Sequence, residues 1–361
     1  MIDHRIHNFS SGPSILPREV LEQAAQELVI HPELGHSIME LSHRTPFWTA
    51  FMERTEADLR ELLAIPDDYA VLFLQGGATF QFTMLPLNLV PEGGVVNMLH
   101  TGRWSQKAIA ELGQLKRRAH IAASSEETQF DRIPTHHTLD EEGVYVHYVD
   151  NNTIYGTEYP APPEVGDALL VCDASSNILS RPMDVARHGL IFAGAQKNLG
   201  PAGLTLVIIR RDLLDRATWS LPKTLHYRPI AQAHSMLNTP PVWPIYITGL
   251  VLRWLKRQGG AEVMAQRNAD KAALLYQAID ETPLFEGCTT ADSRSRMNVT
   301  FRLTRDALTP TFMAEAATHD LHYLKGHRSI GGCRAALYNA MPMESVQLLA
   351  DFIRDFGQRH A

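Results

Sequence analysis

A single lysine, Lys197, lies in the small-residue stretch GAQKNLGPAGLT, residues 194–205. Apolar runs flank this stretch at 190–193 and 204–209, and both are typical of buried strands. Most lysines are solvated surface cations. The place of this one between two buried strands, without bulky neighbours, instead predicts an amine that is held in position for chemistry.

Polar and small residues also follow the other apolar runs, which predict strands at 69–74, 95–99, 144–149 and 168–172. Helical patterns separate several of these runs, which favours an α/β fold with a mostly parallel sheet covered by helices on both faces. Ligands bind beyond the carboxyl ends of such strands. The residues expected there are Gly77, Ala78, Thr79, Trp104, Thr153 and Asp173.

In combination, these residue types suit pyridoxal 5′-phosphate. Lys197 would form the Schiff base, and Asp173 would keep the ring nitrogen protonated so that the ring can accept electrons. Trp104 would stack on the ring, and backbone N–H groups of the 76–79 turn would bind the phosphate. Taken singly, Asp173 fits a helix cap better and Trp104 a packing residue. The prediction therefore requires all of them to meet at one edge of the sheet.

Composition and charge argue against several other classes of function. The chain has 361 residues and a net charge of −7, which gives no general attraction to nucleic acid or anionic membranes. No apolar run is long enough to span a membrane. The cysteines Cys172, Cys288 and Cys333 are odd in number and widely spaced, which predicts free thiols and a cytoplasmic location. No histidine pair has a convincing metal spacing, so we expect no metal.

The order of the predicted elements suggests two domains. Residues 16–258 would form a large cofactor-binding domain that contains the sheet. Residues 1–15 would join 259–361 in a smaller α+β domain, with a strand at 297–303 and a terminal helix at 344–357.

Seven short motifs are spread over nearly the whole chain: NFSSGP (8–13), MELSHR (39–44), GAQKNLGPAG (194–203), NTPP (238–241), RSRMN (294–298), KGHR (325–328) and YNAMP (338–342). Together they resemble the phosphoserine aminotransferases, a family of class-V aminotransferases with fold type I. The resemblance implies a seven-stranded sheet and a homodimer with active sites at the subunit interface. Residues 117–140 match the family pattern poorly, and we interpret them as a surface excursion.

The resemblance also assigns roles to single residues. Lys197 and Asp173 are the implied catalytic residues. The implied cofactor-binding set adds Gly77, Ala78, Thr79, Trp104, Thr153 and Gln196, with Asn238 and Thr239 reaching over from the neighbouring subunit. The implied substrate-binding set is Arg44, His43, His327 and Arg328 for the distal anion and Arg334 for the α-carboxylate. Thr79 stands where some members carry an arginine, so part of the anion contact is expected to differ.

The implied activity is reversible transamination between 3-phosphohydroxypyruvate with glutamate and phosphoserine with 2-oxoglutarate, a step of serine biosynthesis. A phosphohydroxythreonine substrate in pyridoxine biosynthesis stays open. The alternative is another class-V aminotransferase, of the serine- or alanine-glyoxylate type, which would not need the distal arginines. A cysteine desulfurase is disfavoured because Cys172 lies inside an apolar run. A non-catalytic regulator would require a DNA-binding module, for which the chain has no spare length or basic patch.

Overall fold

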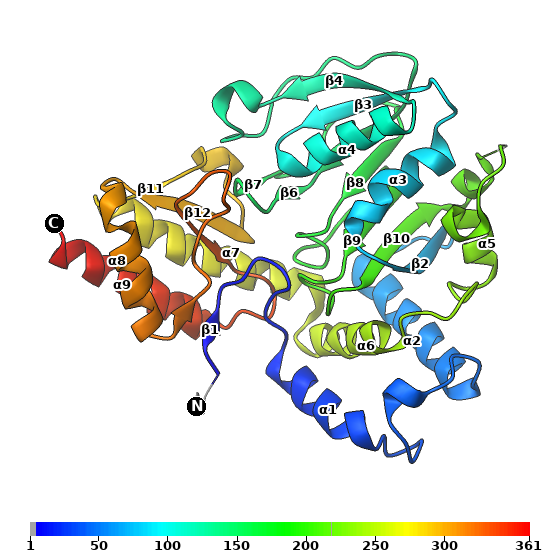
Figure 1. Cartoon of the computed structure of the whole chain (residues 1–361), viewed down its shortest axis with the longest axis horizontal. Coiled ribbons are helices and arrows are strands. Elements are labelled where there is room, and N and C mark those ends of the chain that lie inside the picture. The colour runs from blue at the N-terminus through cyan, green and yellow to red at the C-terminus, as the bar shows by residue number, and fades with distance from the viewer. Residues whose placement is uncertain (1–4, 218) are drawn as a thin grey trace.

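Residues 5–217 and 219–361 are described by a computed structural model, in which a twisted central sheet is packed between helices (Figure 1). Within these residues the sheet has seven strands in the order β2-β10-β9-β8-β5-β3-β4. Their bounds are β2 Tyr69–Gln75, β3 Val95–His100, β4 Arg118–Ser124, β5 Gly143–Val149, β8 Leu170–Asp173, β9 Leu190–Gly194 and β10 Leu204–Arg210. Except for β10, which runs antiparallel to both β2 and β9, neighbouring strands are parallel.

Alternate residues of each central strand pack on opposite faces, as the two-residue period of a strand requires. On one face, Val71, Cys172 and Ile191 belong to a core shared with α1, α2 and α6. On the other face, Leu72 and Phe192 pack with α3, α4 and α5. The helix bounds are α1 Arg18–Val29, α2 Pro46–Leu63, α3 Ala78–Leu89, α4 Arg103–Gln114, α5 Tyr227–Gln232 and α6 Val242–Arg257. This double covering explains the continuous apolar runs and confirms the predicted fold class.

The interpretation of 117–140 as a surface excursion is wrong for its first part. Residues 118–124 form β4, which pairs in parallel with β3 at the edge of the sheet. Most of its residues are at least partly exposed, because an edge strand has a neighbour on one side only. Such a strand lacks the apolar run that identifies the buried strands.

A second core lies at the other end of the molecule (Figure 1). It combines the antiparallel sheet β11-β12-β14 with three helices and with Phe9 and Ile15 of the N-terminal segment. Strand β1 pairs in parallel with β13. The bounds are β1 His7–Asn8, α7 Gly260–Asp280, β11 Phe285–Gly287, β12 Asn298–Leu303, α8 Thr309–Thr318, β13 Leu321–His322, β14 Cys333–Ala336 and α9 Met343–Arg359. The exact domain boundary at 258 stays a prediction.

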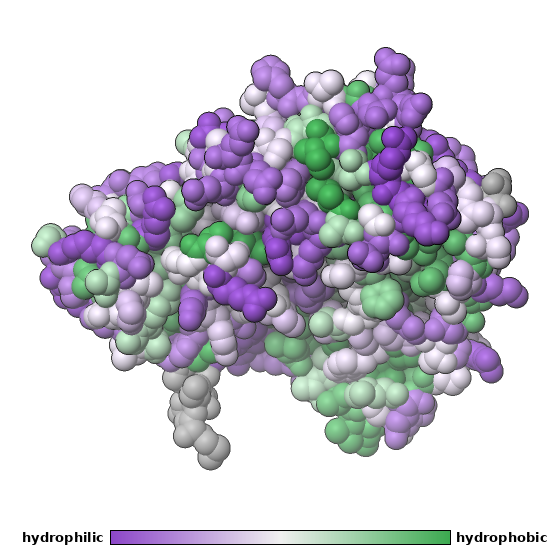
Figure 2. All heavy atoms as spheres, turned by 45° about the horizontal axis from the view of Figure 1, so that its top comes forward, coloured by the Kyte–Doolittle hydropathy of each residue, from purple (hydrophilic) through white to green (hydrophobic). Residues whose placement is uncertain are grey.

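Figure 2 shows a mostly hydrophilic surface with separate hydrophobic patches. Large hydrophobic side chains are exposed on and just after α1: Leu21, Leu28, Val29, Ile30 and Met39. In the part of the chain that the structure describes, no helix has both the length and the apolar content needed to cross a membrane.

Candidate active site

The parallel strands bring four of the predicted site residues to one edge of the sheet. Asp173 is the last residue of β8, and Trp104 is in the first turn of α4, just after β3. Thr153 follows β6 (Asn151–Asn152), a short strand that pairs with β7 (Thr157–Glu158) and comes directly after β5. Lys197 lies in the loop between β9 and β10. The sheet thus collects side chains that are far apart in sequence.

Lys197 is buried, with only 8% of its surface exposed. Its Nζ donates a hydrogen bond to Thr153 Oγ1 at 2.7 Å and lies 5.8 Å from the centre of the Trp104 ring. Burial lowers the pKa of Lys197 to about 8; Asp173 opposes this effect, and Arg334 adds to it. A lysine with this pKa is neutral in about a fifth of the molecules at about pH 7.4, far more often than an exposed lysine, so its amine can act as a nucleophile or a base.

Asp173 is buried and tightly held. Its Oδ1 accepts hydrogen bonds from the backbone N–H of Ser175 at 3.0 Å and from the Ser175 hydroxyl at 2.6 Å. Burial raises the pKa of Asp173, while the Ser175 bonds and the nearby Lys197 favour its charged form. The Asp173 carboxylate accepts its hydrogen bonds within a turn and does not cap a helix. The alternative of a helix cap therefore does not explain why Asp173 lies near Lys197.

Several local features leave room for a bound group next to Lys197. A side chain at Gly77, immediately before α3, would meet no atom within 4 Å, and Ala78 and Thr79 form the accessible first turn of this helix. The N-terminus of a helix attracts phosphate. Among the described residues, the buried Trp104 Nε1 has no hydrogen-bond partner. The donor types, the open turn and the amine together fit pyridoxal 5′-phosphate.

A group of cations lies around His327 and Arg334, next to Thr153. Arg334 on β14 donates a hydrogen bond from Nη1 to the Thr153 carbonyl at 2.9 Å. His327 is close enough to Arg334 for the two to interact, and its pKa is lowered by burial and then by four cations: Arg334, Arg328, Arg103 and Lys107. In the described part of the chain, none of these four cations forms an ion pair with an acid. Such an arrangement attracts an anion.

Other predicted residues lie outside this group. Arg44 is exposed and His43 half-buried, on the loop before α2, and within the described residues neither forms a hydrogen bond or ion pair with Lys197 or Arg334. Asn238 is exposed and donates from Nδ2 to Gln75 Oε1 at 3.2 Å, at the end of β2. The neighbouring Thr239 carbonyl accepts from the Gln75 amide. Within the described residues, these four residues therefore form no hydrogen bond or ion pair with the lysine of their own chain.

Sequence reasoning missed several polar residues that support Lys197. Ser14 donates from its hydroxyl to the Lys197 carbonyl at 2.7 Å. Asn198 Oδ1 accepts from the Asn339 backbone N–H at 3.0 Å, and the buried Tyr338 donates to the Ser11 carbonyl. The motifs quoted above contain four of these residues: Ser11, Asn198, Asn339 and Tyr338. Their place in the motifs was the available sequence signal, because residue type alone gave them no role.

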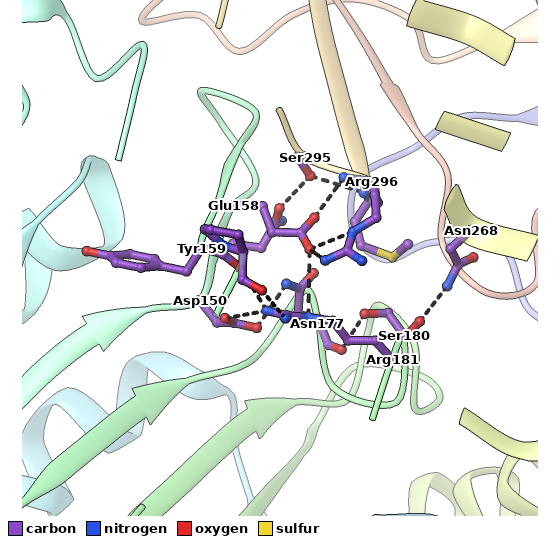
Figure 3. A network of polar contacts seen from close by, with 12 residues as sticks. Asp150, Glu158, Tyr159, Asn177, Ser180, Arg181, Asn268, Ser295 and Arg296 are labelled. Atoms are coloured by element: carbon purple, nitrogen blue, oxygen red, sulfur yellow. Dashed lines mark hydrogen bonds and ion pairs between the residues drawn. The ribbon is translucent and has the colours of Figure 1, made fainter. Parts of the chain in front are cut away.

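Figure 3 shows a second polar network, which joins the β5–β7 region to the segment before β12. Arg181 donates to Asp150 Oδ1 at 2.9 Å, and the backbone N–H of Arg296 donates to Glu158 Oε2 at 2.7 Å. The guanidinium of Arg296 also bonds Glu158. Both carboxylates are almost completely buried, so each depends on its arginine for charge compensation.

Comparison with known proteins agrees with this architecture. The family model Aminotransferase class-V matches residues 6–349, and the chain belongs to this family. Its relatives include the phosphoserine aminotransferase of Acidithiobacillus ferrooxidans, which is 49% identical over 99% of this chain and 100% of the relative. The solved phosphoserine aminotransferase from Bacillus circulans subsp. alkalophilus is 43% identical, with a TM-score of 0.96 and 99% of both chains covered. That from Trichomonas vaginalis, with PLP bound, is 37% identical, with a TM-score of 0.92 and 97% and 100% covered.

Proposed function

We propose that the chain is a phosphoserine:2-oxoglutarate aminotransferase that acts in serine biosynthesis. Its cofactor is pyridoxal 5′-phosphate, which supplies an electron sink for the charge that develops at the substrate Cα. The observation that carries the proposal is the buried Lys197 amine, which lies beside Trp104 and Asp173 at the carboxyl edge of the sheet. Full-length similarity to phosphoserine aminotransferases supports the same reaction.

Each side chain at this edge has a role in the proposed reaction. Lys197 would hold the cofactor and then move the proton at the substrate Cα, a task that suits an amine whose pKa burial lowers to about 8. Asp173 would hold the proton of the ring nitrogen, and Trp104 would cover one face of the ring. Residues available for the phosphate are Gly77, Ala78, Thr79 and Gln196, while Thr153 would contact the ring's oxygen substituent.

The unpaired cations explain the proposed substrate class. Phosphoserine and glutamate each carry an α-carboxylate and a second, more distant anion. Arg334 would bind the α-carboxylate, since an arginine can form two parallel hydrogen bonds with it. His327 and Arg328 would meet the distal anion. The neutral Thr79 supplies no charge there, so these residues carry more of the distal contact.

A homodimer with shared sites would bring in the remaining residues. Arg44, His43, Asn238 and Thr239 would reach the site of the partner subunit, and the exposed hydrophobic side chains on and after α1 offer a surface for association. Two inactive variants, Lys197→Ala and Arg44→Ala, test this arrangement when their subunits are mixed and allowed to exchange. Mixed dimers hold one intact site each, so random exchange restores about a quarter of the parent activity. No recovery after verified exchange would place Arg44 outside the partner's site.

The function itself is tested by the visible absorbance of the purified protein. We expect a yellow chromophore that bleaches with phosphoserine and returns with 2-oxoglutarate. Bleaching by alanine or serine with return by glyoxylate, and no response to phosphoserine, would support the alternative class-V activity instead. The three free cysteines are consistent with the proposed cytoplasmic location, which fractionation of cells would test.

A further inference from the structure

The Tyr338 hydroxyl lies completely buried behind the residues that contact Lys197. It donates its proton to the Ser11 carbonyl at 3.0 Å and accepts a hydrogen bond from Asn298 Nδ2 at 3.3 Å. The Thr153 hydroxyl lies near enough to Tyr338 to favour its charged form. Because a carbonyl can only accept and a tyrosine has one proton, any hydrogen bond between these two hydroxyls must run from Thr153 to Tyr338.

The Ser176 hydroxyl also lies next to the Thr153 hydroxyl. The Ser176 hydroxyl donates to the Asn151 carbonyl at 2.8 Å and accepts from Thr153 Oγ1 at 3.4 Å. Its single proton is thus also committed to a backbone carbonyl. Neither Tyr338 nor Ser176 has a proton left to give to Thr153, so the Thr153 proton points to their side, where Ser176 Oγ accepts it.

The direction of the remaining bond follows. Since the Thr153 proton points away from Lys197, Thr153 Oγ1 accepts from Lys197 Nζ at 2.7 Å. We propose that Tyr338 and Ser176 are positioning residues that fix the orientation of the Thr153 hydroxyl and thereby leave the lone pair of the Lys197 amine free of hydrogen bonds. The inference deepens the proposed function, because a free lone pair is what cofactor capture and proton removal require.

The surroundings hold this arrangement rigidly. Asn151 Nδ2 donates to Asn298 Oδ1 and to Ser176 Oγ, both at 2.8 Å, which joins the two positioning residues through a buried amide. The Lys271 ammonium donates to the carbonyls of Leu337 and Tyr338 at 2.8 and 2.9 Å. The backbone that carries Tyr338 is thus fixed from α7.

The test measures the reactivity of Lys197 directly, in the full-length chain from which the cofactor has been removed. An activated acetyl ester is added in small amounts at about pH 9.5, above the pKa of Lys197 of about 8, and mass spectrometry follows acetylation of this residue. In Tyr338→Phe combined with Ser176→Ala, the Thr153 proton is free to turn to the amine. We expect Lys197 acetylation to slow about fivefold, the factor that one net hydrogen bond contributes, and each single variant to show a smaller effect. Tyr69→Phe is the matched control, since Tyr69 is also buried and donates to a backbone carbonyl, that of His188.

A Thr153→Val background separates this mechanism from a general disturbance of the fold. Without the Thr153 hydroxyl there is no proton to turn, so the Tyr338 and Ser176 substitutions should no longer slow acetylation. An equal slowing in this background, an equal slowing in Tyr69→Phe, or no slowing in the combined variant would overturn the proposal. If the parent protein lacked transaminase activity, the proposed function would fail while these acetylation rates stayed measurable.

Discussion

The Arg334 guanidinium donates a hydrogen bond to the backbone carbonyl of Thr153, whose side chain accepts from Lys197. One residue therefore connects the small antiparallel sheet to the amine at the edge of the central sheet. A ligand bound to Arg334 would act on the backbone of Thr153, so binding at Arg334 and chemistry at the Lys197 amine depend on the same residue.

Replacing Arg334 by alanine should raise KM for phosphoserine and for glutamate alike, because both carry the α-carboxylate. The loss of a bidentate charged contact predicts an increase of about 10- to 100-fold. Steady-state kinetics with each amino acid measure it. Arg302→Ala is the control, since this exposed arginine on β12 pairs with Glu286. A rise in KM for only one substrate would contradict a contact between Arg334 and the α-carboxylate that both substrates share.

Lys197→Ala should remove both transaminase activity and the shift in cofactor absorbance that covalent linkage produces. The chain would still fold, because a smaller apolar side chain replaces a buried amine. Absorbance spectra and gel filtration of the purified variant check both points. Lys116→Ala changes an exposed lysine that pairs with Glu92 and should behave like the parent. Persistence of the shifted band in Lys197→Ala would show that another group holds the cofactor.

The strands that are buried on both faces of the sheet could be predicted from the sequence. Continuous apolar runs identified β2, β3, β5, β8, β9 and β10, whereas the partly exposed edge strand β4 carries no such run. An apolar run does not encode direction, so the reversal of β10 was not predicted. The short connection between Gly194 and Leu204 was the available signal, because a parallel neighbour needs a longer crossover.

The candidate site likewise contains some residues that local sequence patterns could predict and others that only tertiary packing brings in. Trp104 and Asp173 could be placed beside Lys197 because parallel strands end at a common edge. Asn298 begins β12 of the small sheet and Tyr338 follows its strand β14, and no local pattern relates that sheet to the Lys197 loop. Their contacts depend on how the two cores pack, which periodicity does not reveal.

Glu158→Gln should destabilise the protein by about 2–4 kcal/mol, because it leaves Arg296 without a compensating charge and leaves Asp150 as the one acid paired with the partly buried Arg181 among the described residues. Urea unfolding measures this loss. Glu164→Gln breaks the pair with Arg187 at a position where the carboxylate is 84% exposed, and it should cost less than about 1 kcal/mol. Equal losses in the two variants would mean that the network of Figure 3 contributes no more than a surface pair.

The buried Lys271 should make a pH-dependent contribution to the free energy of unfolding of the protein. Burial, and then Arg267, lower the pKa of Lys271 from its ordinary 10.5 to about 7. Between these values the unfolded chain binds more protons than the folded one, so the lysine's contribution grows as the pH rises and declines as it falls toward 7. The loss in unfolding free energy caused by Lys271→Met should therefore be greater at about pH 9 than at about pH 7. A loss that is constant or smaller at the higher pH would contradict the lowered pKa.

The N-terminal segment has a consequence for synthesis. Residues 7–14 are synthesised early, yet their hydrogen-bond partners include the carbonyls of Asp320 and His322 and the backbone N–H of Ala336, which are synthesised much later. Domains ordinarily fold as units in order of emergence. Here the segment that supports Lys197 must wait for residues 320–336, so the large sheet can assemble during translation before the amine reaches its final surroundings.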